Sequence, residues 1–395
     1  MGSFLSSEQS PDYPHLHTDQ ETVNKLDKQM HHLENVMYSP PAVTDKDRKE
    51  LSFPKIELHL HLDGCIRFTT LLETSEKRGI PLKNKKGEVA TTVGELKKML
   101  ITNEPANLAK MLEPFEIFLP VIRGDLETVE KIAYEMCEDQ KNNGVIYFEG
   151  RYAPHLMTDA KTSAKEVVEA VYRGFTRGET DFGVKARSIL CCIRGLDQYT
   201  TEILELATEL KHLGVVAIDV AGTAHGADEQ YEESVVYVFQ EAHKRGIHRT
   251  VHAGESGGPK EVNRALTEMH AERIGHGYRI MNDPELYKNR FLDCKDIHLE
   301  ACPYSSVMTG SVPLDWPKHP VAQWAKDDVN FSVSRDDPTC FDNTILSELV
   351  LVKKELGLTV HQIWKAQLNA ARATFLPESE KQVLVDKILA AEPKE

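Results

Sequence analysis

The sequence predicts a (β/α)8 barrel of the TIM type, and the alternation of two kinds of segment carries that prediction. Eight short apolar runs have the length of strands, and most of them are separated by amphipathic stretches with helical periodicity. Such alternation is typical of parallel strands joined by crossover helices, and a count of eight favours closure into a barrel over an open sheet. No glycine-rich dinucleotide motif follows the first run, which also argues against the open sheet.

The predicted strands begin after residue 53, where apolar runs replace a polar segment. They are 55–62, 145–153, 184–193, 215–222, 249–254, 273–280, 297–303 and 329–337. Helical periodicity is clearest at 163–182, 200–214 and 233–246. We expect these helices to connect successive parallel strands.

The first two predicted strands are separated by about 80 residues, far more than a crossover requires, so we expect an insertion there. Residues 93–122 within it predict two or three amphipathic helices. These helices either cover the mouth of the barrel or pack on its outside, and both arrangements remain open.

Residues 1–50 are polar and predict a poorly ordered N-terminal arm with a helical turn or two at 26–37, ahead of a catalytic domain at 51–395. The arm contains a His-Leu-His triplet at 15–17, which we interpret as solvated histidines because no neighbouring strand supplies further metal ligands. Its start, MGSFLS, fits the pattern of N-myristoylation at Gly2, a hypothesis that mass spectrometry tests.

Charge and cysteine content narrow the possible functions. Lys and Arg total 47 against 62 Asp and Glu, so the formal net charge is −15, and such a surface repels nucleic-acid phosphates. The sequence shows neither an apolar run that spans a bilayer nor the apolar core of a secretory signal. Seven scattered cysteines suit a reducing compartment, so we expect a cytoplasmic protein with buried thiols at Cys191 and Cys192.

Chemically reactive side chains gather at the carboxyl ends of the predicted strands, where barrel enzymes build their active sites. In the first strand, His59, His61 and Asp63 alternate with leucines and therefore point to one side. Each buried imidazole without a hydrogen-bond partner destabilises the fold by about 1 to 3 kcal/mol. A metal ion can supply the missing interaction. The other strand ends contribute Asp219, Gly222, His252, Glu255, His276, Asp336 and Asp337.

Three imidazoles and one carboxylate form a ligand set that suits Zn²⁺ with room for a water molecule. The set is His59, His61, His252 and Asp336. It contains no cysteine, which is typical of a catalytic zinc site. No lysine ends the fourth strand, where barrel hydrolases with two metals often carry a bridging lysine, so we predict one metal ion per chain.

Glu255 and His276 remain outside the ligand set and are the candidate catalytic residues. A free carboxylate beside the metal can carry protons to and from a substrate, and a spare imidazole can orient the nucleophile. The alternatives are an ordinary loop carboxylate and a histidine of the core.

Five ordered motifs are similar to those of the adenosine deaminase family within the metal-dependent deaminases. They are PKIELHLHLDG, VVAIDVAG, TVHAGE, RIGHGY and DDP, with DFGVKARSILCCIR between the first two. The resemblance covers residues 53–381 and leaves out the arm. It implies zinc-dependent deamination of adenosine and 2′-deoxyadenosine to the inosine nucleosides and ammonia. The alternative substrate is another 6-aminopurine, either adenine or an adenine nucleotide.

The resemblance also implies a role for each matched residue. The implied zinc ligands are His59, His61, His252 and Asp336, with His61 also facing the substrate. Glu255 would donate a proton to purine N1, and His276 would assist the attacking hydroxide. Asp337 would hydrogen-bond N7, the Gly222 N–H would contact N3, and Asp63 would bind a ribose hydroxyl.

Two positions depart from the family pattern, and both are expected near the barrel mouth. Thr223 follows Gly222 where an acidic pair is common, and Arg335 precedes the aspartates where threonine is usual. Two other classes remain open: a two-metal barrel amidohydrolase, and a binding protein that kept the fold. The expected partner is a small purine nucleoside, while the oligomeric state stays open, a monomer included.

Overall fold

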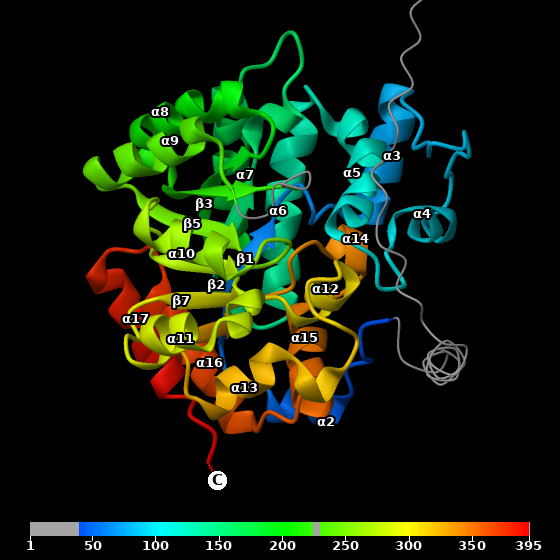
Figure 1. Cartoon of the computed structure of the whole chain (residues 1–395). Helices are drawn as coiled ribbons and strands as arrows, with labels where there is room; N and C mark the ends of the chain where they lie inside the picture. Colours follow the sequence, from blue (N-terminus) through cyan, green and yellow to red (C-terminus); the bar gives the residue numbers. More distant parts are fainter. Residues whose placement is uncertain (1–38, 224–229, 395) are drawn as a thin grey trace, which may run out of the picture. The chain divides into compact units, whose positions relative to one another are not determined.

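Eight parallel strands form a sheet that curls into a barrel, with the helices arranged around it (Figure 1). The computed structural model describes residues 39–223 and 230–394. The strands follow in chain order as β1 (Lys55–His61), β2 (Val145–Tyr152), β3 (Lys185–Ile193), β4 (Val215–Ala221), β5 (His248–Ala253), β6 (Arg273–His276), β7 (His298–Ala301) and β8 (Phe331–Val333). The segment after β8 closes the barrel on β1, where His61 N–H donates to Asp336 O at 3.1 Å. The predicted (β/α)8 barrel is confirmed.

The observed strands agree with the predicted runs, except that three of them are clearly shorter. The run 297–303 forms a strand only at His298–Ala301. The run 273–280 predicts one strand, but β6 ends at His276 because Gly277 adopts φ 76° and turns the chain. In the run 329–337, β8 covers only Phe331–Val333, and beyond it the chain turns at Asp336, whose φ of 63° extended strands do not use. In these last two runs the chain beyond the strand turns at or next to a residue of the predicted site.

The helices cover the outside and the ends of the barrel. They are α2 (Asp45–Glu50), α3 (Phe68–Arg78), α4 (Val93–Leu100), α5 (Leu108–Ile122), α6 (Leu126–Asn142), α7 (Ala164–Phe182), α8 (Thr200–Glu209), α9 (Glu233–Lys244), α10 (Pro259–Thr267), α11 (Pro284–Tyr287), α12 (Pro303–Met308), α13 (Pro320–Lys326), α14 (Pro338–Phe341), α15 (Ile345–Lys354), α16 (Val360–Ala373) and α17 (Glu378–Leu389). The sequence of α7 shows why such segments are helical. Ser163 and Glu166 form a capping box at its start, and Gly183 ends it with φ 68°.

The insertion between β1 and β2 consists of α3 to α6. Its predicted helical segment, 93–122, forms the two helices α4 and α5. Asn107 caps α5 by accepting a hydrogen bond from Lys110 N–H at 2.9 Å. In Figure 1 both helices lie on the same side of the barrel, in cyan.

Part of the predicted N-terminal arm belongs to the described residues. Thr44 caps α2, and the buried Asp47 accepts a hydrogen bond from Lys354 Nζ of α15 at 3.1 Å. Three predicted features lie outside the described residues: the triplet at 15–17, the turns at 26–37 and the modification at Gly2. The division of the chain at residue 50 stays a prediction.

All seven cysteines are free thiols, and Cys191 and Cys192 are buried as predicted. Burial raises the pKa of both thiols, so neither is a reactive thiolate at neutral pH. In the described part of the chain, no helix combines the length and the apolarity that crossing a membrane requires.

Candidate active site

A cavity of about 180 Å³ lies at the carboxyl ends of the strands. The predicted site residues that line it are His61, Asp63, Gly222, His252, Glu255, His276, Asp336 and Asp337. The remaining one, His59, is fully buried, and its ring centre lies 4.6 Å from the ring centres of both His252 and His276. The structure therefore brings all nine predicted residues together.

The opposite wall of this cavity is apolar and comes mainly from α5. Its side chains there are Leu108, Met111, Leu112, Phe115 and Leu119, joined by Leu156 and Ile193. Of the two arrangements open for the inserted helices, α5 adopts the first and covers the barrel mouth. No residue of α4 lines the cavity. The cavity thus has an apolar wall that faces a row of polar groups.

The donor atoms of the four predicted metal ligands converge. His61 Nε2 lies 3.3 Å from His252 Nε2 and 3.4 Å from Asp336 Oδ1. His59 Nε2 lies 3.4 Å from the same carboxylate oxygen. These side chains come from β1, from β5 and from the segment after β8, so they meet only through closure of the barrel.

Two buried carboxylates orient the histidines of this set. His59 Nδ1 lies 2.7 Å from Glu300 Oε2, and His252 Nδ1 lies 2.8 Å from Asp219 Oδ2. Because a carboxylate only accepts, His59 Nδ1 carries the proton of its hydrogen bond, and the close contact of His252 Nδ1 with Asp219 favours the same tautomer, which leaves each Nε2 lone pair for a metal. His59 Nε2 is buried without a hydrogen-bond partner, a costly arrangement that a metal ion relieves. These residues fit a zinc ion.

A third buried residue links the two carboxylates. Arg151 donates to Asp219 Oδ2 at 2.9 Å and to Glu300 Oε2 at 2.6 Å, and all three side chains are fully buried. Sequence reasoning noted Asp219 only as a strand end and missed Arg151 and Glu300. The available signal was a charged residue in the middle of a predicted parallel strand, where aliphatic side chains are usual.

Burial favours the neutral form of three of the four site histidines, whereas the neighbouring Asp336 and Glu300 raise the pKa of the fourth, His59. Desolvation is the main cause that lowers the pKa of His61, His252 and His276, and the neighbouring imidazoles lower it further. Neutral imidazole is the form that binds a metal ion. His276 Nε2 lies 3.7 Å from both Glu255 Oε1 and Asp336 Oδ2, which places it between the candidate proton donor and the ligand set.

The carboxyl groups of the cavity differ in protonation. Burial opposes ionisation of Asp336, but its interactions with the neighbouring imidazoles, His59 foremost, outweigh burial and hold the pKa of Asp336 well below its usual range. Burial and the charge of Asp336 together raise the pKa of Glu255 to about 8 and also raise the pKa of Asp337. Burial raises the pKa of Asp63 to about 7. One carboxylate is thus poised to bind a cation, while its neighbours can hold protons.

The backbone is strained at two site residues. His276 has φ 69° and Asp336 has φ 63°, in the left-handed region that residues other than glycine seldom occupy. Close packing adds a further constraint, because a Cβ on Gly275 would lie 2.8 Å from His59 Cε1. Such strain persists only where the surroundings enforce it, which agrees with a site that holds its side chains in place.

The expectation that Arg335 lies near the mouth is wrong. Its side chain is buried and points to the core, with Nε 3.5 Å from Glu57 Oε1, and it does not line the cavity. Glu57 Oε1 also accepts the Arg335 N–H at 3.0 Å. Through these contacts with Glu57, Arg335 holds the backbone that leads into Asp336 and Asp337 from the side of the core.

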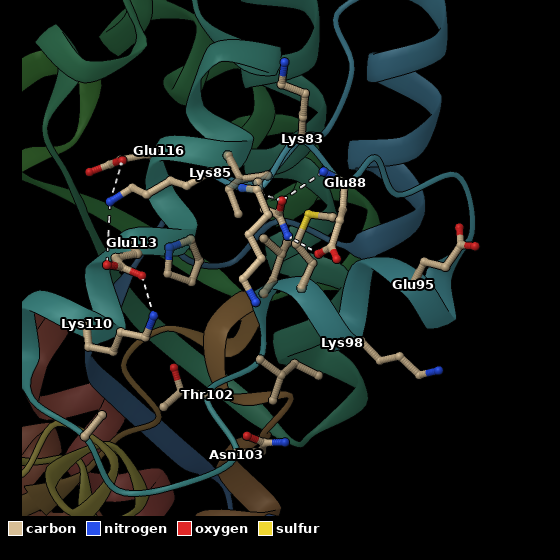
Figure 2. A pocket seen from close by; sticks show the side chains of 18 of the residues that line it. Lys83, Lys85, Glu88, Glu95, Lys98, Thr102, Asn103, Lys110, Glu113 and Glu116 are labelled. Atoms are coloured by element: carbon tan, nitrogen blue, oxygen red, sulfur yellow. Dashed lines mark hydrogen bonds and ion pairs between the residues drawn. The ribbon is translucent and has the colours of Figure 1, made fainter.

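A larger groove, of about 840 Å³, lies on the outer side of α5 (Figure 2). It is lined by residues from 83–89, α4, the segment 101–106 and α5. Lys85 Nζ lies 3.2 Å from Glu116 across it, whereas the pair of Lys110 Nζ and Glu113, at 2.6 Å, joins successive turns of α5. None of its lining residues is a histidine or a cysteine. The smaller cavity is therefore the one that carries the chemistry.

Comparison with known proteins shows which proteins this chain is similar to. Residues 54–391 match the profile of the family described as adenosine deaminase. The adenosine deaminases of Gallus gallus and Danio rerio are each 41% identical, over 352 and 350 residues, covering 86% of this chain and 95% of each relative. The solved structure of arabidopsis N6-mAMP deaminase has a TM-score of 0.73 at 27% identity, covering 87% of this chain and 99% of that one.

The chain belongs to the adenosine deaminase family. The resemblance inferred from five motifs is thereby confirmed. The match to the adenosine deaminase family begins at residue 54 and spans the whole barrel.

Proposed function

We propose that this protein is a zinc-dependent hydrolase that deaminates adenosine and 2′-deoxyadenosine to inosine and 2′-deoxyinosine, releasing ammonia. One observation carries the proposal. The donor atoms of His59, His61, His252 and Asp336 lie 3.3 to 3.4 Å apart in successive pairs, with Glu255 and His276 beside them in one cavity. Membership of the adenosine deaminase family supports it.

A single Zn²⁺ held by these four side chains would lower the pKa of water enough to supply the nucleophile at neutral pH. The protein's own groups do the rest. With a pKa of about 8, Glu255 holds a proton at neutral pH and can donate it to purine N1. Neutral His276, next to Glu255, can hydrogen-bond the attacking oxygen as it approaches C6.

Three further groups would hold the nucleoside. Purine N3 and N7 are acceptors, so each needs a donor. The Gly222 N–H can serve N3, and a protonated Asp337 can serve N7 because its pKa is raised. Asp63 lines the same cavity and can bind a ribose hydroxyl.

The alternative substrates differ in charge, and the cavity discriminates among them. Among the described residues, no lysine or arginine lines the cavity, whereas four carboxyl groups do: Asp63, Glu255, Asp336 and Asp337. A nucleotide would bring its phosphate among these groups without a lysine or arginine side chain in the cavity lining to pair with it. This favours nucleosides over adenine nucleotides, while adenine itself remains the alternative.

The test is a substrate panel on the purified protein with its native metal. Adenosine and 2′-deoxyadenosine should be converted to the inosine products, as followed by the fall in absorbance near the adenosine maximum. AMP should react poorly, and adenine provides the control for the ribose contacts. A folded protein with bound zinc that leaves adenosine unchanged would refute the proposal.

We also propose that residues 51–395 suffice for catalysis and that the protein works in the cytoplasm. The match to the family from residue 54 supports the domain boundary, and the free thiols suit a reducing compartment. A protein truncated at residue 51 should keep the activity of the full chain. Fluorescence microscopy of the tagged full chain tests the compartment.

A further inference from the structure

The turn that carries Glu255 is held from behind by three buried side chains, here called the Arg194 clamp: Arg194, Tyr231 and Glu261. Arg194 directly follows β3, Tyr231 precedes α9, and Glu261 lies in the first turn of α10. Their exposed fractions are 6%, 4% and 1%. The three residues thus come from separate segments of the chain, and their side chains meet below the end of β5.

The clamp contacts the backbone on both sides of Ala253. Arg194 Nη2 donates to His252 O at 3.0 Å, and the Tyr231 hydroxyl donates to the same oxygen at 3.1 Å. Glu261 Oε2 accepts the Gly254 N–H at 2.7 Å. The backbone is thus fixed at the carbonyl of a proposed metal ligand and at the amide that precedes Glu255.

The clamp is also closed on itself. Arg194 Nη2 donates to Glu261 Oε1 at 2.6 Å, and its guanidinium lies 4.6 Å from the centre of the Tyr231 ring. Glu261 therefore uses one oxygen for Arg194 and the other for Gly254. Replacing its carboxylate with an amide leaves one of these two donors facing an NH2 group.

The turn itself has little freedom to adjust. Gly254 adopts φ 71°, and a Cβ there would lie 2.8 Å from Val262 Cγ2. Because Gly254 is in a left-handed conformation and tightly packed, its backbone cannot relax by itself. We expect that loss of its hydrogen bond to Glu261 moves the whole turn. Glu255, the next residue, moves with it.

We propose that Glu261 and Arg194 are positioning residues that aim the Glu255 carboxyl at the substrate. This inference rests on the proposed function. Neither residue lines the cavity, so their effect passes through the backbone of residues 252–254. A displacement of about 1 Å at a reacting group can lower the rate by about 100-fold, so the clamp acts on kcat more than on KM.

The test compares Glu261→Gln and the milder Tyr231→Phe with a control at the other end of β5. There Arg249 Nη2 contacts Glu272 Oε1 at 2.5 Å and Arg249 Nε donates to His270 O at 2.8 Å, so Glu272→Gln breaks a similar pair far from the turn. We expect Glu261→Gln to lower kcat at least about 10-fold with KM within about two-fold. Tyr231→Phe should lower kcat about three-fold, and Glu272→Gln should leave it unchanged.

Amide hydrogen exchange supplies a readout that does not depend on activity. Exchange at residues 252–256 should become faster in Glu261→Gln, and less so in Tyr231→Phe, but not in Glu272→Gln. Zinc content should match that of the wild type. Unchanged kcat in folded Glu261→Gln, or loss of kcat only in parallel with loss of zinc, overturns the proposal.

The two hypotheses fail in different ways. A wild-type protein that is inert on adenosine refutes the proposed function, while the exchange data still decide whether the clamp holds the turn. Normal exchange at residues 252–256 in both clamp variants overturns the clamp whatever the substrate. If Glu261→Gln does not fold, Tyr231→Phe decides alone, and wild-type values for its kcat and its exchange overturn the proposal.

Discussion

Replacing Glu300 by glutamine should weaken both the fold and metal binding, because every acceptor position of this carboxylate is used. Oε2 contacts His59 Nδ1 at 2.7 Å and accepts from Arg151 Nη2 at 2.6 Å. Oε1 accepts from Thr250 Oγ1 at 2.9 Å and lies 2.7 Å from Arg273 Nε. Glutamine keeps the shape of the side chain but turns one acceptor into a donor.

If the amide nitrogen replaces Oε2, the contacts with His59 and Arg151 are both lost; if it replaces Oε1, it faces Arg273 Nε, while the Thr250 hydroxyl can turn and accept from it. A hydrogen bond to a charged group contributes about 1.5 to 3 kcal/mol, so Glu300→Gln should lower the free energy of unfolding by about 1.5 to 6 kcal/mol. If the amide nitrogen faces His59, that imidazole also loses the group that orients it. Loss of such an orienting partner typically weakens metal binding by about 10-fold to 100-fold.

Urea unfolding of the metal-free protein measures the first effect, and competition with a zinc chelator measures the second. Glu73→Gln is the control, since it breaks an exposed ion pair to Lys131 and should change neither quantity measurably. A loss of stability below about 1 kcal/mol together with unchanged zinc affinity would show that the buried carboxylate does not hold His59 as we argue.

Three further predictions test the chemistry and the buried charges. Glu255→Gln should lower kcat by about 100-fold to 10,000-fold while zinc content stays normal, and activity near that of the wild type would exclude Glu255 as the proton donor. Chelation should abolish activity and added Zn²⁺ should restore it, whereas full activity in a protein shown to be metal-free would contradict the proposed site. Burial raises the pKa of Glu348 from 4.5 to about 8, so the stability that its protonated form contributes is complete below the unfolded value and is lost as pH rises toward the folded value. The urea midpoint of Glu348→Gln should thus fall less steeply than that of the wild type across this range, and equal slopes would refute the assignment.

Local sequence was enough to predict the barrel because strand and helix patterns depend on neighbouring residues. The alternation of residues 55–62 placed His59 and His61 on one side, and the capping residues Ser163 and Gly183 bound a helix where periodicity predicts one. The parallel order of the strands followed from their crossover helices. The end of β6 could not be predicted, because it depends on the backbone turn at Gly277, and the turn at Asp336 beyond β8 could not be predicted either.

The ligand set could be predicted because its members stand at strand ends, where barrel closure brings them together. The buried residues that hold these ligands in place could not be predicted. Glu300 lies 241 positions from His59, and nothing local distinguishes it from an ordinary buried charge. The same holds for Glu261 of the Arg194 clamp, which looks like a solvated residue of the first turn of α10 until the packing is known.

By itself, the sequence determined the (β/α)8 architecture, the shared side of the first strand on which His59 and His61 lie, and the family. Only the tertiary structure decided which charges pair in the interior, that α5 and not α4 covers the mouth, and that Arg335 faces away from it. Periodicity arises from covalent geometry and is repeated along the chain. Pairing between distant side chains depends instead on strand register and on closure of the barrel, which exist only once the whole chain has folded.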